Sequence, residues 1–119
     1  MAKKPAITQS ETGSPLSEPV FLILLSLASG EKHGYAILKD VESLSQKRLT
    51  LSTSTLYGAL ARLEDQGLIE HIETGGLVAP GLPRRVFQLS PIGRRTLETE
   101  TKRMQSLAVI AQQRLSENG

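Results

Sequence analysis

The sequence contains no cysteine and no tryptophan, and Phe and Tyr bring the aromatic fraction to only 3%. Without cysteine the chain can form neither a disulfide nor a thiolate metal site. Without tryptophan it lacks the largest rigid ring on which a flat ligand could stack. The core must therefore be built from the aliphatic side chains of Leu, Ile, Val and Ala.

The chain also lacks a long hydrophobic run. The longest, Val20–Ala28, is interrupted by Ser26 and falls far short of the roughly 20 residues that span a bilayer. The basic start, Met1–Lys4, is followed by the polar segment Pro5–Pro15 rather than by the apolar core of a signal peptide. We therefore expect a soluble, cytoplasmic protein.

Patterns that support catalysis or metal binding are missing as well. The only histidines, His33 and His71, do not stand at metal-ligand spacing. Gly75-Gly76 is not followed by the Lys and Ser or Thr of a phosphate-binding loop. No nucleophile, base and orienting group form a recognisable set. We therefore expect no enzyme activity, no cofactor and no metal site.

The 119 residues suffice for one compact domain with a modest core. Residues 1–16 mix Lys, Pro, Thr, Ser and Gly without periodicity, which is typical of a flexible N-terminal arm. Residues 17–90 carry patterns of helices and a hairpin, and residues 91–119 carry the pattern of one helix. The sequence thus predicts an arm, a central domain and a terminal helix.

Three short helices are predicted in the central domain. Ser17 is a typical N-cap for a helix over residues 18–29, a second helix spans residues 34–45, and Ser52 caps a third over residues 53–66. The connection before the third helix is short and polar. This arrangement is typical of a helix-turn-helix.

A β-hairpin follows the third helix. Strands are predicted over residues 68–73 and 85–90, because Phe87 and Leu89 alternate with polar residues in the second. The glycines and prolines of residues 74–84 predict a long flexible tip between the strands. The predicted fold is mainly α with a small β-hairpin: a winged helix-turn-helix followed by a C-terminal dimerisation helix.

The terminal helix is predicted to begin near Pro91 and to carry a heptad seam. The seam residues are spaced alternately by four and three: Leu97, Thr101, Met104, Ala108, Ala111 and Leu115. Because no other segment remains to cover this seam, we expect it to pack against a second copy of the chain and form a homodimer.

The third predicted helix has two unlike faces. Leu56, Leu60 and Leu63 form its inner stripe. The opposite face and its flanks carry Ser54, Tyr57, Gly58, Ala61, Arg62 and Asp65. Small uncharged side chains would let the helix lie close to a DNA groove, whereas a solvated face usually carries Lys and Glu. An ordinary packing helix remains the alternative.

Half of the fourteen basic residues fall in two windows without carboxylates, residues 43–63 and 74–97. Such windows suit a surface that faces phosphates. Arg84-Arg85, after the hairpin tip, is predicted to contact phosphate or the minor groove. Lys47-Arg48, ahead of the third helix, is a second candidate. For both pairs a merely solubilising role is the alternative.

Several short phrases of the sequence together resemble the PadR family in its order and spacing. They are His33-Gly34-Tyr35, Leu49–Ser52, Thr55–Leu60, Arg62-Leu63-Glu64 and Gly67-Leu68-Ile69, then Gly81–Arg85, Phe87, Leu89-Ser90 and Gly93. The resemblance spans about residues 17–97 and departs from the family pattern at Leu82 and Val86. Leu82 replaces a frequent basic wing residue, and Val86 replaces a frequent aromatic one.

The resemblance implies a winged-helix regulator that binds a palindromic promoter site as a homodimer, usually as a repressor. It implies that the stretch Ser52–Tyr57 enters the major groove and that Tyr57 and Arg84 approach the DNA backbone. The full set of predicted DNA-binding residues is Lys47, Arg48, Ser52, Thr53, Ser54, Thr55, Tyr57, Gly58, Arg62, Arg84 and Arg85.

Two questions stay open at this point. Some family members release DNA on binding phenolic or drug-like molecules, and the multidrug-binding members stack flat ligands on Trp, which this chain lacks. The alternative is an effector of another kind, either a small molecule or a protein. The main alternative function is a winged helix used for protein–protein interaction without direct DNA readout, because fold alone does not dictate function.

Overall fold

The structure, a computed structural model, describes residues 15–79 and 82–118, with the side chains of residues 15–73 and 85–117. Its elements are α2 (Glu18–Ala28), β1 (Lys32–His33), α3 (Gly34–Leu44), α4 (Thr53–Asp65), β2 (Ile69–Ala79), β3 (Leu82–Leu89) and α5 (Pro91–Asn118). The fold is mainly helical with a small antiparallel sheet, as predicted. The first three helices end within one residue of their predicted ends.

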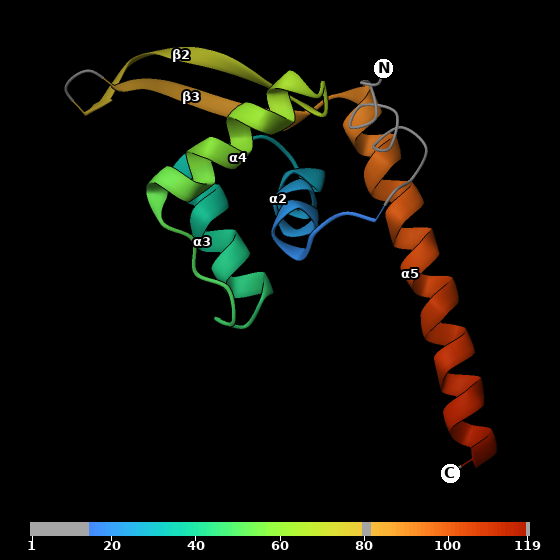
Figure 1. The fold of residues 1–119 in the computed structure, drawn as a ribbon. Coiled ribbons are helices and arrows are strands. Elements are labelled where there is room, and N and C mark those ends of the chain that lie inside the picture. Colours follow the sequence, from blue (N-terminus) through green and yellow to red (C-terminus); the bar gives the residue numbers. More distant parts are fainter. Residues whose placement is uncertain (1–14, 80–81, 119) are drawn as a thin grey trace, which may run out of the picture.

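Helix α2 lies in the middle of the fold, between α3 and α5 (Figure 1). Ser17 caps it, because its Oγ accepts a hydrogen bond from the N–H of Val20 at 3.3 Å. Pro19 stands in the first turn, where a missing N–H leaves no partner unpaired. The buried side chains of α2 are Leu22, Ile23, Leu24, Ser26 and Leu27. The apolar sequence of this helix thus reflects burial on several sides.

The segment before α2 is tied to α5. The side chain of Leu16 packs against the core, and its N–H donates a hydrogen bond of 3.2 Å to Oε2 of Glu100. The sequence assigned Leu16 to the N-terminal arm, whereas the structure makes it part of the folded domain. Residues 1–14 of the predicted arm lie outside the described residues.

The sheet has three strands in the order β1-β3-β2, all antiparallel, where the sequence predicted only two. The missed strand β1 pairs Lys32 with Phe87 and His33 with Val86. The His33 ring strengthens this edge, because its Nδ1–H donates to the carbonyl oxygen of Arg85 at 3.2 Å. A strand of two residues is too short to show an alternation of apolar and polar side chains, so only its pairing with β3 reveals it.

The hairpin strands are longer than predicted. Strand β2 continues to Ala79 and β3 begins at Leu82, so much of the predicted tip, residues 74–84, is strand. The prediction of a long loop over this range is therefore wrong. The register shifts between Glu73 and Leu77 and again before Ala79, and these irregularities accommodate the Gly-rich sequence within the ladder. The base of the hairpin lies along α4, and its outer part extends beyond the helices (Figure 1).

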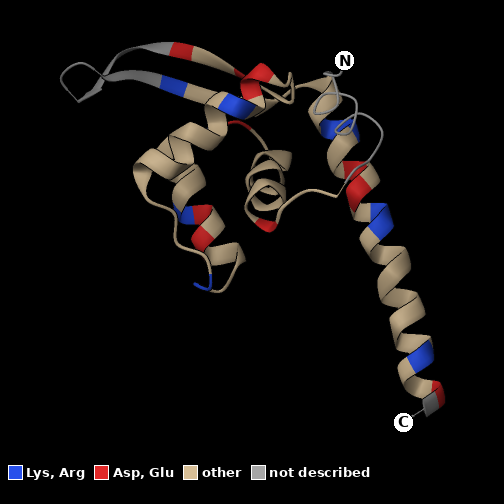
Figure 2. Ribbon diagram, viewed as in Figure 1, with Lys and Arg blue, Asp and Glu red and all other residues tan. Residues whose placement is uncertain are grey.

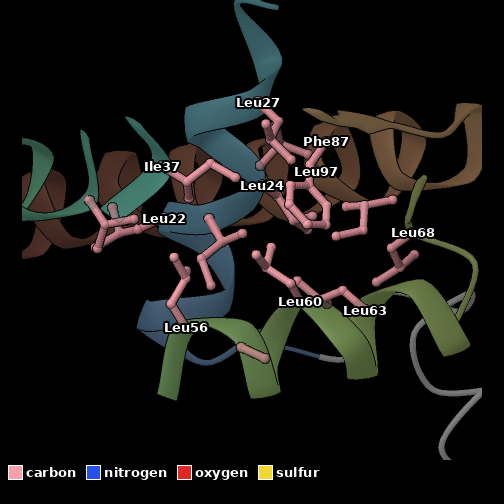
Figure 3. Close-up of a cluster of buried hydrophobic side chains, with 14 residues drawn as sticks. Leu22, Leu24, Leu27, Ile37, Leu56, Leu60, Leu63, Leu68, Phe87 and Leu97 are labelled. Carbon is pink, nitrogen blue, oxygen red and sulfur yellow. The ribbon is translucent and has the colours of Figure 1, made fainter. Parts of the chain in front are cut away.

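The core lies where α2, α4, the base of the hairpin and the start of α5 meet (Figure 3). Leucines from these elements surround Phe87 of β3, whose side chain is fully buried. Helix α3 contributes Ile37 and Val41 from its inner face. The expected aliphatic core is therefore present, with one aromatic ring at its centre.

Gly93 allows α5 to begin against the turn that follows α4. The N–H of Ser90 donates to the carbonyl oxygen of Leu68 at 3.0 Å, and Ser90 Oγ donates to that of Gly67 at 2.6 Å. A Cβ at Gly93 would stand only 1.9 Å from the Leu68 oxygen, which is backbone and cannot swing away. The close approach of α5 to the rest of the domain therefore requires glycine here.

Helix α5 packs its first turns against the domain and then runs past it (Figure 1). Thr96, Leu97 and Glu100 are buried, whereas every side chain from Met104 to Glu117 is exposed. Neither α5 nor any other helix in the described ranges is both long enough and apolar enough to cross a membrane.

We expect Gly93→Ala to destabilise the fold by at least about 2 kcal/mol, because the new methyl group must displace backbone. The control is Gly58→Ala, where a Cβ would meet only Nη1 of Arg62, at 3.7 Å. That variant should gain up to about 1 kcal/mol from helix propensity. Denaturant unfolding of both variants checks this, and equal midpoints for Gly93→Ala and the parent chain would contradict the account.

Candidate nucleic-acid interface

Helix α4 begins at a polar cap and buries one narrow stripe. Ser52 Oγ accepts a hydrogen bond from the N–H of Thr55 at 3.1 Å. Leu56, Leu60 and Leu63 are buried along the inner side of the helix, as their spacing predicted. The exposed hydroxyl residues Thr53, Ser54 and Thr55 therefore form the first turn of a helix that is fixed to the core by its other side.

The opposite face of α4 is exposed and smooth. Ser54, Ala61 and Asp65 are exposed, and Gly58 between them is half-buried, with only Nη1 of Arg62 near the place that a Cβ would take. The charged residues of α4 are confined to its last turns, near the hairpin base (Figure 2). The first part of this face can therefore approach another surface closely without bringing carboxylates with it.

Tyr57 lies on the flank of α4 and is only partly available for an outside contact. Its ring packs edge-on against Phe87, with centroids 6.4 Å apart, and its side chain is 41% exposed. A Cβ at Gly34 would stand 2.2 Å from the Tyr57 hydroxyl oxygen, so this hydroxyl sits directly over the start of α3. The residue predicted to approach DNA thus also links α4, α3 and β3.

The base of the hairpin carries an ion pair that the sequence pattern concealed. Glu73 of β2 faces Arg85 of β3 across the ladder, and Oε2 of Glu73 is 3.7 Å from Nε of Arg85. Acidic and basic positions lie side by side there (Figure 2). Residues 74–97 contain no carboxylate, but the fold places the carboxylate of Glu73 beside Arg85. The side chain of Arg84 lies outside the described residues.

Lys47 and Arg48 lie in the turn after α3, and both side chains are exposed. Gln46 and Lys47 in this turn have positive φ angles of 57° and 67°. Nη2 of Arg48 is 3.1 Å from Oε2 of Glu18 at the start of α2. Arg48 therefore faces α2 and the groove beside it.

That groove, between α2 and α5, has a volume of about 440 Å³. Phe21, Leu44 and Met104 line it with apolar surface, and the ion pairs Glu18–Arg48 and Glu100–Arg103 border it. Leu44, the last residue of α3, is exposed on this side. No sequence pattern indicates the groove, because its walls come from segments far apart in the chain.

Glu100 is a buried carboxylate whose partners are all supplied by the chain. It is 3% exposed and accepts hydrogen bonds from the N–H of Leu16 and from Nε and Nη2 of Arg103. The hydrogen bonds from Arg103 lower the pKa of Glu100, against the opposing effect of burial. The ionised carboxylate therefore fastens the segment before α2 to the start of α5.

The predicted seam of α5 needs one correction and two additions. Leu97 is 6% exposed and belongs to the core of its own chain, so it cannot serve a seam with a second copy. Thr101, Met104, Ala108, Ala111 and Leu115 are exposed as the prediction requires. Two exposed apolar residues that the strict seven-residue spacing left out lie on one side of the seam: Leu107 is about 60° around the helix from Met104, and Ile110 is about 120° from it.

Within the described ranges, no three His, Asp or Glu side chains cluster in a way that could hold a metal ion. The groups that the structure does gather are polar hydroxyls on α4, cations and carboxylates at the hairpin base, and an apolar stripe on α5. Such groups can bind another macromolecule by shape, hydrogen bonding and charge.

Comparison with known proteins gives consistent matches. The model of the PadR-like family of transcriptional regulators matches residues 23–99. A 37.1 kDa protein of transposon Tn4556 from Streptomyces fradiae is 42% identical over 87 residues, which are 73% of this chain and 23% of that protein. The chain thus spans about a quarter of that relative's length.

Two further matches are a transcriptional regulator and a PadR protein bound to operator DNA. A transcriptional regulator of Mycobacterium tuberculosis is 34% identical over 86 residues, which cover 72% of this chain and 75% of that protein. The crystal structure of Bacillus subtilis PadR in complex with operator DNA aligns with a TM-score of 0.57 at 25% identity, over 66% of this chain and 44% of that chain.

The family model covers most of the helices and the hairpin described above, and the mycobacterial relative matches over most of both chains. The family is one of transcriptional regulators and not of enzymes. The chain therefore belongs to the PadR-like family of transcriptional regulators.

Proposed function

We propose that this protein is a cytoplasmic repressor that binds double-stranded DNA at a palindromic promoter site as a homodimer. The observation that carries the proposal is the exposed face of α4, whose side chains are small and uncharged over the first turns. The buried leucine stripe on the other side of the helix holds this face in place. The Bacillus subtilis PadR structure with operator DNA shows a relative of this fold engaged with the same class of partner.

Helix α4 is the element that enters the major groove in this proposal. The groove admits an α-helix and presents a distinct pattern of donors and acceptors for each base pair. Ser52, Thr53, Ser54 and Thr55 supply short hydroxyl groups that can both donate and accept. Gly58 and Ala61 add no bulk, so the helix axis can lie close to the base edges.

Arginine side chains near the end of α4 and on the hairpin hold the protein to the DNA backbone in this proposal. Arg62 is exposed at the end of α4, and Arg84 and Arg85 lie on the hairpin. Phosphate contacts of this kind position a protein without reading sequence. Arg85 must share its charge between phosphate and Glu73, so its contribution is smaller than that of an arginine without a carboxylate beside it. Arg48 has no direct place in this interface.

The second copy covers the exposed stripe of α5. Beyond Arg103 the side chains of this helix are exposed, and its apolar residues continue from the groove beside α2. A two-fold dimer through α5 would present two copies of α4 to two half-sites, which is the geometry that a palindromic operator demands. An effector, a small molecule or a protein, would act by changing this dimer geometry.

We expect Gly58→Glu to abolish DNA binding while the fold is retained. Glu at position 58 has a better helix propensity than Gly and stands one turn before Arg62, so thermal stability should be unchanged or higher. Its carboxylate would face phosphates and its bulk would separate the helix from the groove. Affinity for the DNA upstream of the gene, measured by fluorescence anisotropy, should fall at least about 100-fold.

The matched control is Ser43→Glu, which adds the same charge at an exposed position of α3. It should bind within about twofold of the parent chain. A protein–protein module would instead show no retention of the parent chain on random duplex DNA at low salt. Normal binding by Gly58→Glu would remove α4 from the interface.

We expect the double change Met104→Glu and Leu107→Glu to produce monomers. Each charge would be buried against the partner without a counterion, and the dimer dissociation constant should rise at least about 100-fold. The control is Val109→Glu, because Val109 is equally apolar and exposed but lies about 140° around the helix from Met104. Light scattering that shows dimers of the double variant, or monomers of the control, would contradict the predicted seam.

A further inference from the structure

A chain of side-chain contacts starts on α4, crosses the base of the hairpin and returns to α4. Tyr57, in the second turn of α4, meets Phe87 of β3 edge-on, with centroids 6.4 Å apart and ring planes at 64°. Phe87 in turn meets the His71 ring of β2, with centroids 6.1 Å apart. The run closes on α4, because His71 Nδ1–H donates a hydrogen bond to Oε2 of Glu64 in the last turns of that helix.

The two points of attachment lie on the same side of α4. Tyr57 and Glu64 are seven residues apart, which is close to two full turns. The buried core holds α4 against the inner side of the hairpin base, and the Glu64–His71 hydrogen bond adds an attachment outside that core. The Phe87 end is buried in the core, but the side chains of His71 and Glu64 are 30% and 26% exposed. The Glu64–His71 hydrogen bond is thus the outer and more easily broken link.

We propose that Glu64 and His71 are positioning residues for DNA binding: their hydrogen bond holds the hairpin at a fixed angle to α4. This inference rests on the proposed DNA-binding function. When α4 lies in the major groove, that angle decides whether the hairpin arginines reach the adjacent phosphates. Glu64 and His71 would then set the affinity for DNA without touching it.

Electrostatics makes the proposal distinguishable from a direct role. A carboxylate close to DNA repels phosphates, so its removal should by charge alone raise the affinity. The proposal requires the opposite for Glu64, since loss of the hydrogen bond releases the hairpin. Glu70 is a matched neighbour on β2: its side chain is exposed and accepts a hydrogen bond of 3.1 Å from Gln88 rather than from His71.

The experiment compares Glu64→Ala, His71→Ala and Glu70→Ala in the full-length dimer, with random-sequence duplex DNA as the probe at a series of salt concentrations. Glu64→Ala and His71→Ala should each weaken binding about fivefold to tenfold, and together no more than either alone. The slope of log K against log salt should shrink by about 0.9 for each phosphate that the protein no longer neutralises. Glu70→Ala should bind at least as tightly as the parent chain, with an unchanged slope.

Two further arms separate positioning from a general loss of structure. Glu64→Gln keeps an oxygen that accepts from His71 Nδ1–H and should restore binding to within about twofold of the parent chain. In the background Arg84→Ala with Arg85→Ala, the cost of Glu64→Ala should largely vanish, because the arginines that the hydrogen bond positions are already absent. Thermal unfolding of each variant ensures that binding is measured on folded protein.

The outcomes are distinct. Failure of the parent chain to bind duplex DNA would overturn the proposed function itself. Normal binding by the parent chain, combined with equal affinity and equal slope for Glu64→Ala and His71→Ala, would overturn only the positioning role. The positioning role would also be overturned if Glu64→Ala weakened DNA binding by the same factor in the Arg84→Ala, Arg85→Ala background as in the parent chain.

Discussion

The arrangement of this molecule depends on the burial of one narrow stripe of α4. Leu56, Leu60 and Leu63 are each at most 2% exposed and pack toward α2 and Phe87 (Figure 3). Full burial of one such side chain contributes about 1.5–3 kcal/mol, so rotation of α4 about its axis would forfeit several of these contributions at once. The stripe therefore fixes which face of α4 is exposed. That face needs no stabilising side chains of its own, and it can carry Ser54 and Gly58 where a solvated helix would carry Lys and Glu.

The hairpin needs a separate constraint, because its outer part extends away from the core (Figure 1). Its base is tied to α4 through Phe87 and the Glu64–His71 hydrogen bond, and to the start of α3 through the pairing of His33 with Val86. Helix α5 is fixed independently, by Gly93 at its start and by Glu100 further along. The proposed DNA-reading helix α4, the hairpin and the proposed dimer helix α5 are thus each attached to the same small core.

The sequence was informative wherever a local rule determines structure. Ser17 and Ser52 cap helices as predicted, and the leucine spacing of α4 correctly separated its buried from its exposed face. The sequence misled where the outcome depends on distant partners. β1 exists only through pairing with β3, and the Gly-rich stretch of β2 became strand because β3 lies opposite it. Leu97 satisfied the heptad spacing but found its partners in the core, and Glu73 and His71 pair with residues that local patterns do not identify.

Site-directed cross-linking tests most directly whether the exposed face of α4 reads DNA. The chain has no cysteine, so Ser54→Cys introduces a single thiol on that face, and Cys is close to Ser in size. The thiol is alkylated with a photoactivated cross-linker and the protein is bound to duplex DNA. The account predicts strong cross-links from position 54 to DNA bases and few from Ser43→Cys, which is also exposed but lies on α3. Cross-links from position 43 in the absence of cross-links from position 54 would contradict it.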